Sequence, residues 1–132
     1  MSAQEGTMSK PGEHIDPAAC EHISRMLARI CDKWTLLVIR ELGRGPRRFN
    51  ALRRDVGEIS QKMLTQTLKE LEENGLVSRT VTPVTPPQVE YALTALGKDF
   101  FRPVRALAVW VAINSEEITQ ARSAYAKVRA SN

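Results

Sequence analysis

A stretch rich in basic and amide side chains lies in the middle of this 132-residue sequence. Residues 43–69 hold seven basic residues against two acidic ones, a larger positive excess than that of the whole chain, whose formal net charge is +4. Arginine and lysine neutralise phosphate groups, and glutamine, lysine and threonine can hydrogen-bond to base edges in a DNA groove. The concentration of positive charge therefore points to a nucleic-acid partner.

The side chains that could perform this chemistry divide into two groups. A helix predicted at residues 61–74 carries in its first turns the side chains expected to read bases, which are Gln61, Lys62, Thr65 and Gln66. The side chains expected to contact phosphates are Arg47, Arg48, Arg53, Arg54, Ser60, Lys69 and Arg79. Ser60 belongs to the second group because the amino end of a helix favours an anion.

Helices must position these side chains, and hydrophobic periodicity predicts where they lie. Apolar residues at helical spacing predict helices at about residues 17–31, 33–42, 51–56 and 61–74. The expected amino-terminal caps of these four helices are Asp16, Asp32, Asn50 and Ser60. In the fourth helix, leucines occupy one face and the polar side chains the other, and Gly75 supplies a left-handed stop.

The hydrophobic period changes after residue 76. Alternation in residues 77–82 and again in residues 89–94 predicts an antiparallel hairpin, whose proline-rich loop is stiff. Thr94 is expected to cap a long helical region. Asn114, followed three residues later by a glutamate, has the pattern of a capping box and predicts a separate final helix.

The last three of these four helices are short and are followed by the hairpin. This is the order of a winged helix-turn-helix, in which the helix after the tight turn enters the DNA major groove. We therefore predict an α+β fold, mainly helical, built as a winged helix-turn-helix. The expected division is a flexible arm at residues 1–15, a DNA-binding domain at residues 16–113 and a C-terminal helix at residues 114–132.

Several separated blocks of the chain agree in order and spacing with one known family. They are Cys20, Lys33-Trp34-Thr35, Gly45-Pro46-Arg47-Arg48-Phe49, residues 59–66, residues 68–77 and Val89-Glu90-Tyr91. On these residues the chain resembles the HxlR-type winged-helix transcription regulators of bacteria, which are related to MarR-like regulators. The resemblance covers about residues 20–110. It implies a homodimer on an operator with two half-sites, in which helical dimerisation extensions, the first and fifth helices of the DNA-binding domain, contribute to the dimer contact. It also implies that the fourth helix reads double-stranded DNA and that the hairpin acts as the wing.

The two cysteines, Cys20 and Cys31, are too few for a secreted disulfide framework, so a reducing cytoplasm is the expected compartment. The resemblance places Cys20 at the position of an amino-terminal cysteine with which some family members sense oxidants or electrophiles. The alternative is that Cys20 is only a small hydrophobic residue on an apolar helix face. Cys31 is expected in the core.

Other function classes find no support in the spacing of residues. No nucleophile with a base, carboxylate pair or phosphate cradle stands out, so we expect no enzyme and no cofactor. No cluster of metal ligands or membrane-spanning segment is expected either. One rival remains open, a winged-helix interaction module whose basic face meets an acidic protein. DNA binding that weakens steeply with salt would distinguish the two.

Overall fold

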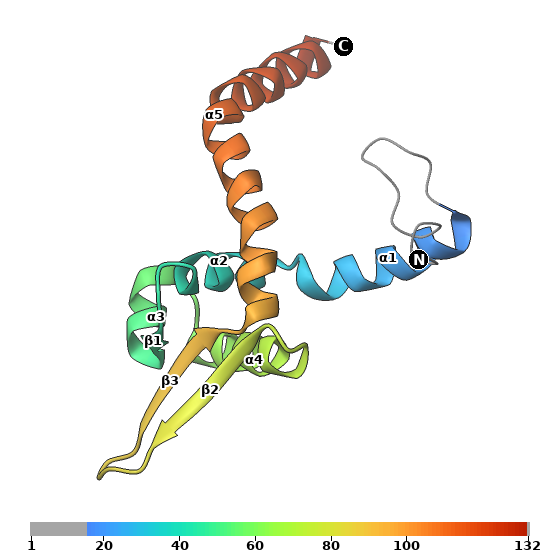
Figure 1. Cartoon of the computed structure of the whole chain (residues 1–132). Helices are drawn as coiled ribbons and strands as arrows, with labels where there is room; N and C mark the ends of the chain where they lie inside the picture. Colours follow the sequence, from blue (N-terminus) through green and yellow to red (C-terminus); the bar gives the residue numbers. More distant parts are fainter. Residues whose placement is uncertain (1–15, 132) are drawn as a thin grey trace.

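The computed structural model describes residues 16–131, so the arm predicted at residues 1–15 lies outside the described part of the chain. Within residues 16–131, five helices and three strands follow in the order α1 (Pro17–Ile30), α2 (Lys33–Leu42), β1 (Arg47–Arg48), α3 (Phe49–Val56), α4 (Gln61–Glu73), β2 (Val77–Thr82), β3 (Gln88–Leu93) and α5 (Ala95–Ser131). The predicted fold class, a mainly helical winged helix-turn-helix, is confirmed. The β2–β3 hairpin projects from the centre of the molecule, and α1 and α5 extend away from it in other directions (Figure 1).

Side-chain caps determine where α2 and α4 begin. The carboxylate of Asp32 accepts a hydrogen bond from the backbone N–H of Trp34 over 3.1 Å. The hydroxyl of Ser60 accepts one from the backbone N–H of Met63 over 3.0 Å. Each bond satisfies a first-turn amide that has no partner within its helix. Both predicted caps are confirmed.

The cap predicted at Asn50 is wrong, and the cap predicted at Asp16 is confirmed in position only. Asp16 is the N-cap residue of α1, directly before Pro17, but its side chain forms no capping hydrogen bond. The first turn of α1 is largely exposed, so water can satisfy its amides. Helix α3 begins at Phe49, with Arg48 in the N-cap position, and Asn50 therefore lies inside the first turn. Strand β1 ends directly before this helix, so the pairing of the strand sets the start of α3.

Helix α4 ends in a Schellman motif. The backbone N–H of Leu76 donates to the carbonyl of Leu71 over 3.0 Å, and that of Gly75 donates to the carbonyl of Glu72 over 3.1 Å. Gly75 has a φ of 75°, a left-handed conformation that glycine adopts without steric cost. The predicted left-handed stop is confirmed, and it directs the chain into β2.

The sheet has the strand order β1-β3-β2, and both pairings are antiparallel. The predicted hairpin is confirmed, with Val77 opposite Leu93 and Thr82 opposite Gln88. Strand β1 is not apparent from the sequence, because two residues are too short to show a hydrophobic period. Arg47 of β1 pairs with Tyr91 on β3, which ties the start of α3 to the base of the hairpin.

The hydrophobic core lies between α2, α3, α4 and the base of the hairpin. Its largest fully buried side chains are Val38, Ile39, Leu52, Leu64, Leu68 and Leu71. The leucine face predicted for α4 is therefore packed inside, which leaves the opposite face of that helix outside.

Helix α5 is one continuous helix, so the separate final helix predicted from Asn114 is wrong. The Asn114 side chain does not cap a helix: its Nδ2 donates to the carbonyl of Trp110, one turn back, over 2.8 Å. The helix also continues through Pro103, and its axis bends further along (Figure 1). At its start, the hydroxyl of Thr94 accepts a hydrogen bond from the N–H of Gly97 over 3.0 Å, as predicted.

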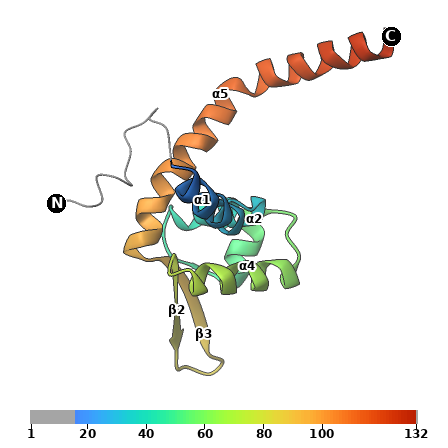
Figure 2. The same cartoon turned by 90° about the vertical axis from the view of Figure 1, so that its right-hand side faces the viewer.

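The two ends of the described chain bury little. Helix α1 has no buried residue. In Figure 2 the last part of α5 extends away from the rest of the molecule. These helices expose large apolar side chains, which include Ile23, Met26 and Leu27 of α1 and Leu107, Val109, Trp110, Val111 and Ile113 of α5. None of the helices in residues 16–131 combines the length and apolar character that crossing a bilayer would require.

Candidate nucleic-acid interface

The outer face of α4 carries the four side chains predicted to read bases. Leu64 and Leu68 anchor the inner face and are at most 1% exposed. Gln61, Lys62, Thr65 and Gln66 are all exposed. Since the Ser60 cap holds the first turn and the Schellman motif holds the last, α4 presents this polar face on a rigid helix.

The predicted base readers differ in their contacts. The side chains of Gln61, Lys62 and Thr65 form no hydrogen bond or ion pair with any other residue in the range 16–131. Gln66 does: its Nε2 donates to Oε2 of Glu70 over 3.0 Å. Three of the four are thus available to an external partner, and the fourth is already oriented by a neighbour.

The arginines predicted to contact phosphates fall into two classes. Arg53, Arg54 and Arg79 are exposed and form no ion pair with another described residue. Arg47 is engaged instead: its Nη1 donates to the carbonyl of Pro46 over 2.9 Å, and its Nε lies 3.5 Å from Oδ2 of Asp55. Its side chain is only 27% exposed. Arg47 is therefore held mainly by its own chain.

Arg48 links α3 to the wing. Its Nη2 donates to Oε1 of Gln88, at the start of β3, over 2.6 Å. Arg48, Asn50 and Arg54 on one side and Pro86 and Gln88 on the other line an open cavity of about 530 Å³. This cavity separates α3 from the proline-rich loop, and the two guanidinium groups make it cationic, so it suits a phosphate group.

Three contacts at this surface are not apparent from the sequence. Gln88 was not predicted as the partner of Arg48, because forty positions separate them. Glu70 was not predicted as the partner of Gln66, although a spacing of four on one helix makes such a pair neighbours. Arg44 counted toward the basic stretch, but its Nη1 lies 3.4 Å from Oε1 of the buried Glu41, which offsets its charge.

The cysteines lie at opposite ends of α1. Cys20 is in its second turn and Cys31 at its carboxyl cap, and both are exposed. The prediction that Cys31 belongs to the core is wrong, since α1 contributes no buried residue to the core of its own chain. Among residues 16–131, no three His, Cys, Asp or Glu side chains gather in a way that could hold a metal ion.

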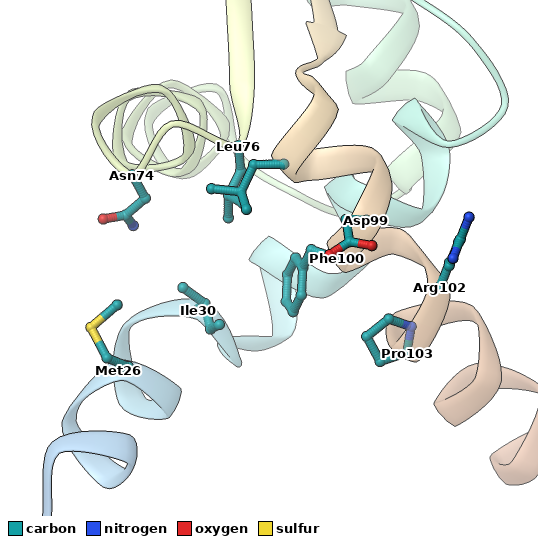
Figure 3. A pocket seen from close by; sticks show the side chains of 9 residues that line it. Met26, Ile30, Asn74, Leu76, Asp99, Phe100, Arg102 and Pro103 are labelled. Carbon is teal, nitrogen blue, oxygen red and sulfur yellow. The ribbon is translucent and has the colours of Figure 1, made fainter. Parts of the chain in front are cut away.

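A second cavity lies between α1 and α5, and its lining includes Asn74 at the carboxyl end of α4. Its volume is about 480 Å³, and its lining is mainly apolar. Figure 3 shows Met26 and Ile30 on α1 on one side and Phe100 and Pro103 on α5 on the other. Such a lining favours apolar side chains or an apolar molecule over a charged one.

The tight turn between α3 and α4, the exposed polar face of α4 and the adjoining hairpin define a winged helix-turn-helix protein of the DNA-binding class. The model of the HxlR-like helix-turn-helix family matches residues 29–119. The chain belongs to this family, as its sequence blocks predicted.

Individual relatives support the assignment to this family. The uncharacterized HTH-type transcriptional regulator YtfH of Escherichia coli (strain K12) is 41% identical over 97 residues, which make up 74% of this chain and 77% of YtfH. The solved structure of the regulator ytfH from Salmonella typhimurium is 39% identical, has a TM-score of 0.72, and is matched over 76% of this chain and 90% of its own. The redox regulator HypR in its oxidized form is 36% identical with a TM-score of 0.66, over 70% of this chain and 96% of HypR.

The family and these relatives make the chain a transcriptional regulator with a helix-turn-helix DNA-binding domain. The relatives are named as regulators and not as enzymes, in line with the absence of catalytic spacings in the sequence.

Proposed function

We propose that a homodimer of this chain binds a palindromic operator in the cytoplasm. In this proposal α4 of each copy lies in the major groove, and the two reading helices are about 34 Å apart, one turn of the duplex. One observation carries the proposal: the leucine face of α4 is fully packed while its polar face is exposed. Gln61, Lys62 and Thr65 lack partners within the described chain and can therefore bond to base edges.

Exposed apolar side chains on α1 and α5 support the dimer. Leu27 is 48% exposed and Trp110 is 54% exposed, and an apolar groove of about 460 Å³ runs between α2 and α5. Large exposed apolar patches mark surfaces that associate with another protein. A second copy that packed its own α1 and α5 against this surface would cover the exposed apolar side chains and the groove.

The decisive experiment compares Lys62→Ala with Lys127→Ala. Operators are selected from randomised duplexes, and the affinity of each variant is measured on the selected operator and on unrelated DNA. Lys62→Ala is expected to lower operator affinity by about tenfold or more, the cost of one lost base contact, with a smaller loss on unrelated DNA. Lys127→Ala removes the same charge near the end of α5 and is expected to change neither affinity much.

Two results would contradict the proposal. An equal loss on both DNAs for Lys62→Ala would assign the lysine to phosphate contact alone. A flat dependence of affinity on salt would exclude phosphate neutralisation, which gives a linear fall of log affinity with log salt. That second result would favour the rival function, a winged-helix module that binds an acidic protein.

We further propose that oxidation or electrophilic modification of Cys20 changes operator binding. The side chain of Cys20 is exposed on α1, a helix of the proposed dimer surface, so a change in its size or charge would act on the dimer. The likeness to the redox regulator HypR supports this assignment. Peroxide is expected to alter operator affinity of the native chain and of Cys31→Ser but not of Cys20→Ser. An equal response in all three would overturn it.

A further inference from the structure

Gln66 and Glu70 form a hydrogen-bonded pair on the exposed side of α4. Nε2 of Gln66 donates to Oε2 of Glu70 over 3.0 Å. The residues are four positions apart, where side chains on one helix are neighbours. Within residues 16–131 Glu70 forms no ion pair with a basic residue. Its carboxylate therefore acts on Gln66 without competition from a cation of the described chain.

This contact determines which way the Gln66 amide faces. An ionised carboxylate accepts hydrogen bonds and cannot donate them. If the amide turned over, its carbonyl oxygen would meet the carboxylate of Glu70, and two acceptors repel each other. The nitrogen of Gln66 consequently stays on the side of Glu70, and Oε1 is left to accept a hydrogen bond from outside.

The bases differ in what they offer to such an acceptor. In the major groove, adenine and cytosine present exocyclic amino groups, at N6 and N4, that donate hydrogen bonds. Guanine presents N7 and O6 and thymine presents O4, all of which are acceptors. Glu70 occupies one of the two N–H donors of the Gln66 amide and holds the amide oxygen outward. A glutamine held with its oxygen outward fits the amino groups of adenine or cytosine better than the acceptors of guanine or thymine.

We propose that Glu70 is a positioning residue that makes Gln66 select a base with an exocyclic amino group, adenine or cytosine, at one position of each half-site. The proposal rests on the proposed function, because it requires α4 to lie in the major groove. Glu70 acts through the Gln66 amide and needs no contact with a base.

The test compares Glu70→Gln with Glu73→Gln in the full chain. Glutamine has nearly the shape of glutamate but donates as well as accepts, so Glu70→Gln permits both orientations of the Gln66 amide. Glu73→Gln removes the same charge from the same helix at a residue that does not bond to Gln66. The base pair that Gln66 contacts is located first. It is the operator position at which the native chain prefers particular bases and Gln66→Ala does not. Affinity is then measured with each of the four bases there.

The native chain and Glu73→Gln are expected to prefer adenine or cytosine at that position. Glu70→Gln is expected to reduce this preference about two- to tenfold, the range of one net hydrogen bond, with other positions unchanged. A native preference for guanine or thymine, or an unchanged preference in Glu70→Gln, would overturn the inference. So would selection in which Gln66→Ala alters no position, although the proposed function would stand. If the native chain selected no DNA sequence at all, the inference about Glu70 and the proposed function would both be contradicted.

Discussion

The centre of the molecule and its two helical ends place their apolar side chains differently. In the centre, α2, α3, α4 and the base of the hairpin enclose Ile39, Leu52 and Leu64, each of which is 0% exposed. At the ends, α1 has no fully buried residue, and Trp110 of α5 is 54% exposed. The polar face of α4 thus rests on a core that one chain completes by itself. The apolar surfaces of α1 and α5 are the part that a second chain would complete.

The largest effect is expected from a cavity in the centre. Leu68→Ala should lower the free energy of unfolding by about 2–5 kcal/mol, because Leu68 is 1% exposed and truncation leaves a void among packed side chains. Urea denaturation followed by circular dichroism measures the change. Met63→Ala, at a 41% exposed position on the same helix, is the matched control and should cost far less. Equal losses would mean that the two faces of α4 are not distinct.

A negative charge on the exposed apolar part of α5 should weaken the proposed dimer. Trp110→Glu is expected to convert the proposed dimer to a monomer in sedimentation experiments, because a carboxylate in an apolar interface loses its hydration. Operator affinity should then fall about 100-fold or more, since two linked half-site contacts become one. Gln120→Glu places the same charge at a polar position of α5 and should leave the dimer intact. A dimeric Trp110→Glu variant would locate the interface elsewhere.

Within the centre of the molecule, an exposed arginine and an arginine that contacts its own chain should contribute differently to DNA binding. Arg54→Ala should weaken binding to every duplex and reduce the slope of log affinity against log salt by about one, as expected for one lost phosphate contact. Arg47→Ala should change that slope less, because the Arg47 guanidinium is held by a carbonyl and by Asp55. Fluorescence anisotropy across a salt series measures both slopes. A larger change for Arg47 would reverse this assignment.

The smallest expected effect is a difference in unfolding free energy between substitutions at the starts of α4 and α1. Ser60→Ala should lower the free energy of unfolding by about 1 kcal/mol, since it removes the acceptor for the Met63 amide at the start of α4. Asp16→Ala should have almost no effect, because Asp16 forms no capping hydrogen bond at the start of α1. Thermal or urea unfolding of the two variants tests the difference. A comparable loss in Asp16→Ala would show that α1 depends on this carboxylate after all.

The amino-acid sequence by itself determined the features whose causes are local. The caps at Asp32 and Ser60 join atoms two or three residues apart, and the stop at Gly75 depends on the conformational freedom of one residue. The hydrophobic period placed the leucines of α4 on one face and the strands of the hairpin opposite each other. All of these follow from geometry repeated within a helical turn or a strand, so a linear pattern contains them.

Only the tertiary structure decided the features that depend on distant partners. Arg48 meets Gln88 because β1 pairs with β3, and neither residue indicates the other across forty positions. Residue type predicts Arg47 as a phosphate ligand, but only the folded chain shows that Asp55 and the carbonyl of Pro46 contact its guanidinium group. Cys31 looked apolar enough for the core, but the helix it ends contributes no buried residue. Burial and hydrogen-bond partners are properties of three-dimensional packing, and residue type alone does not specify them.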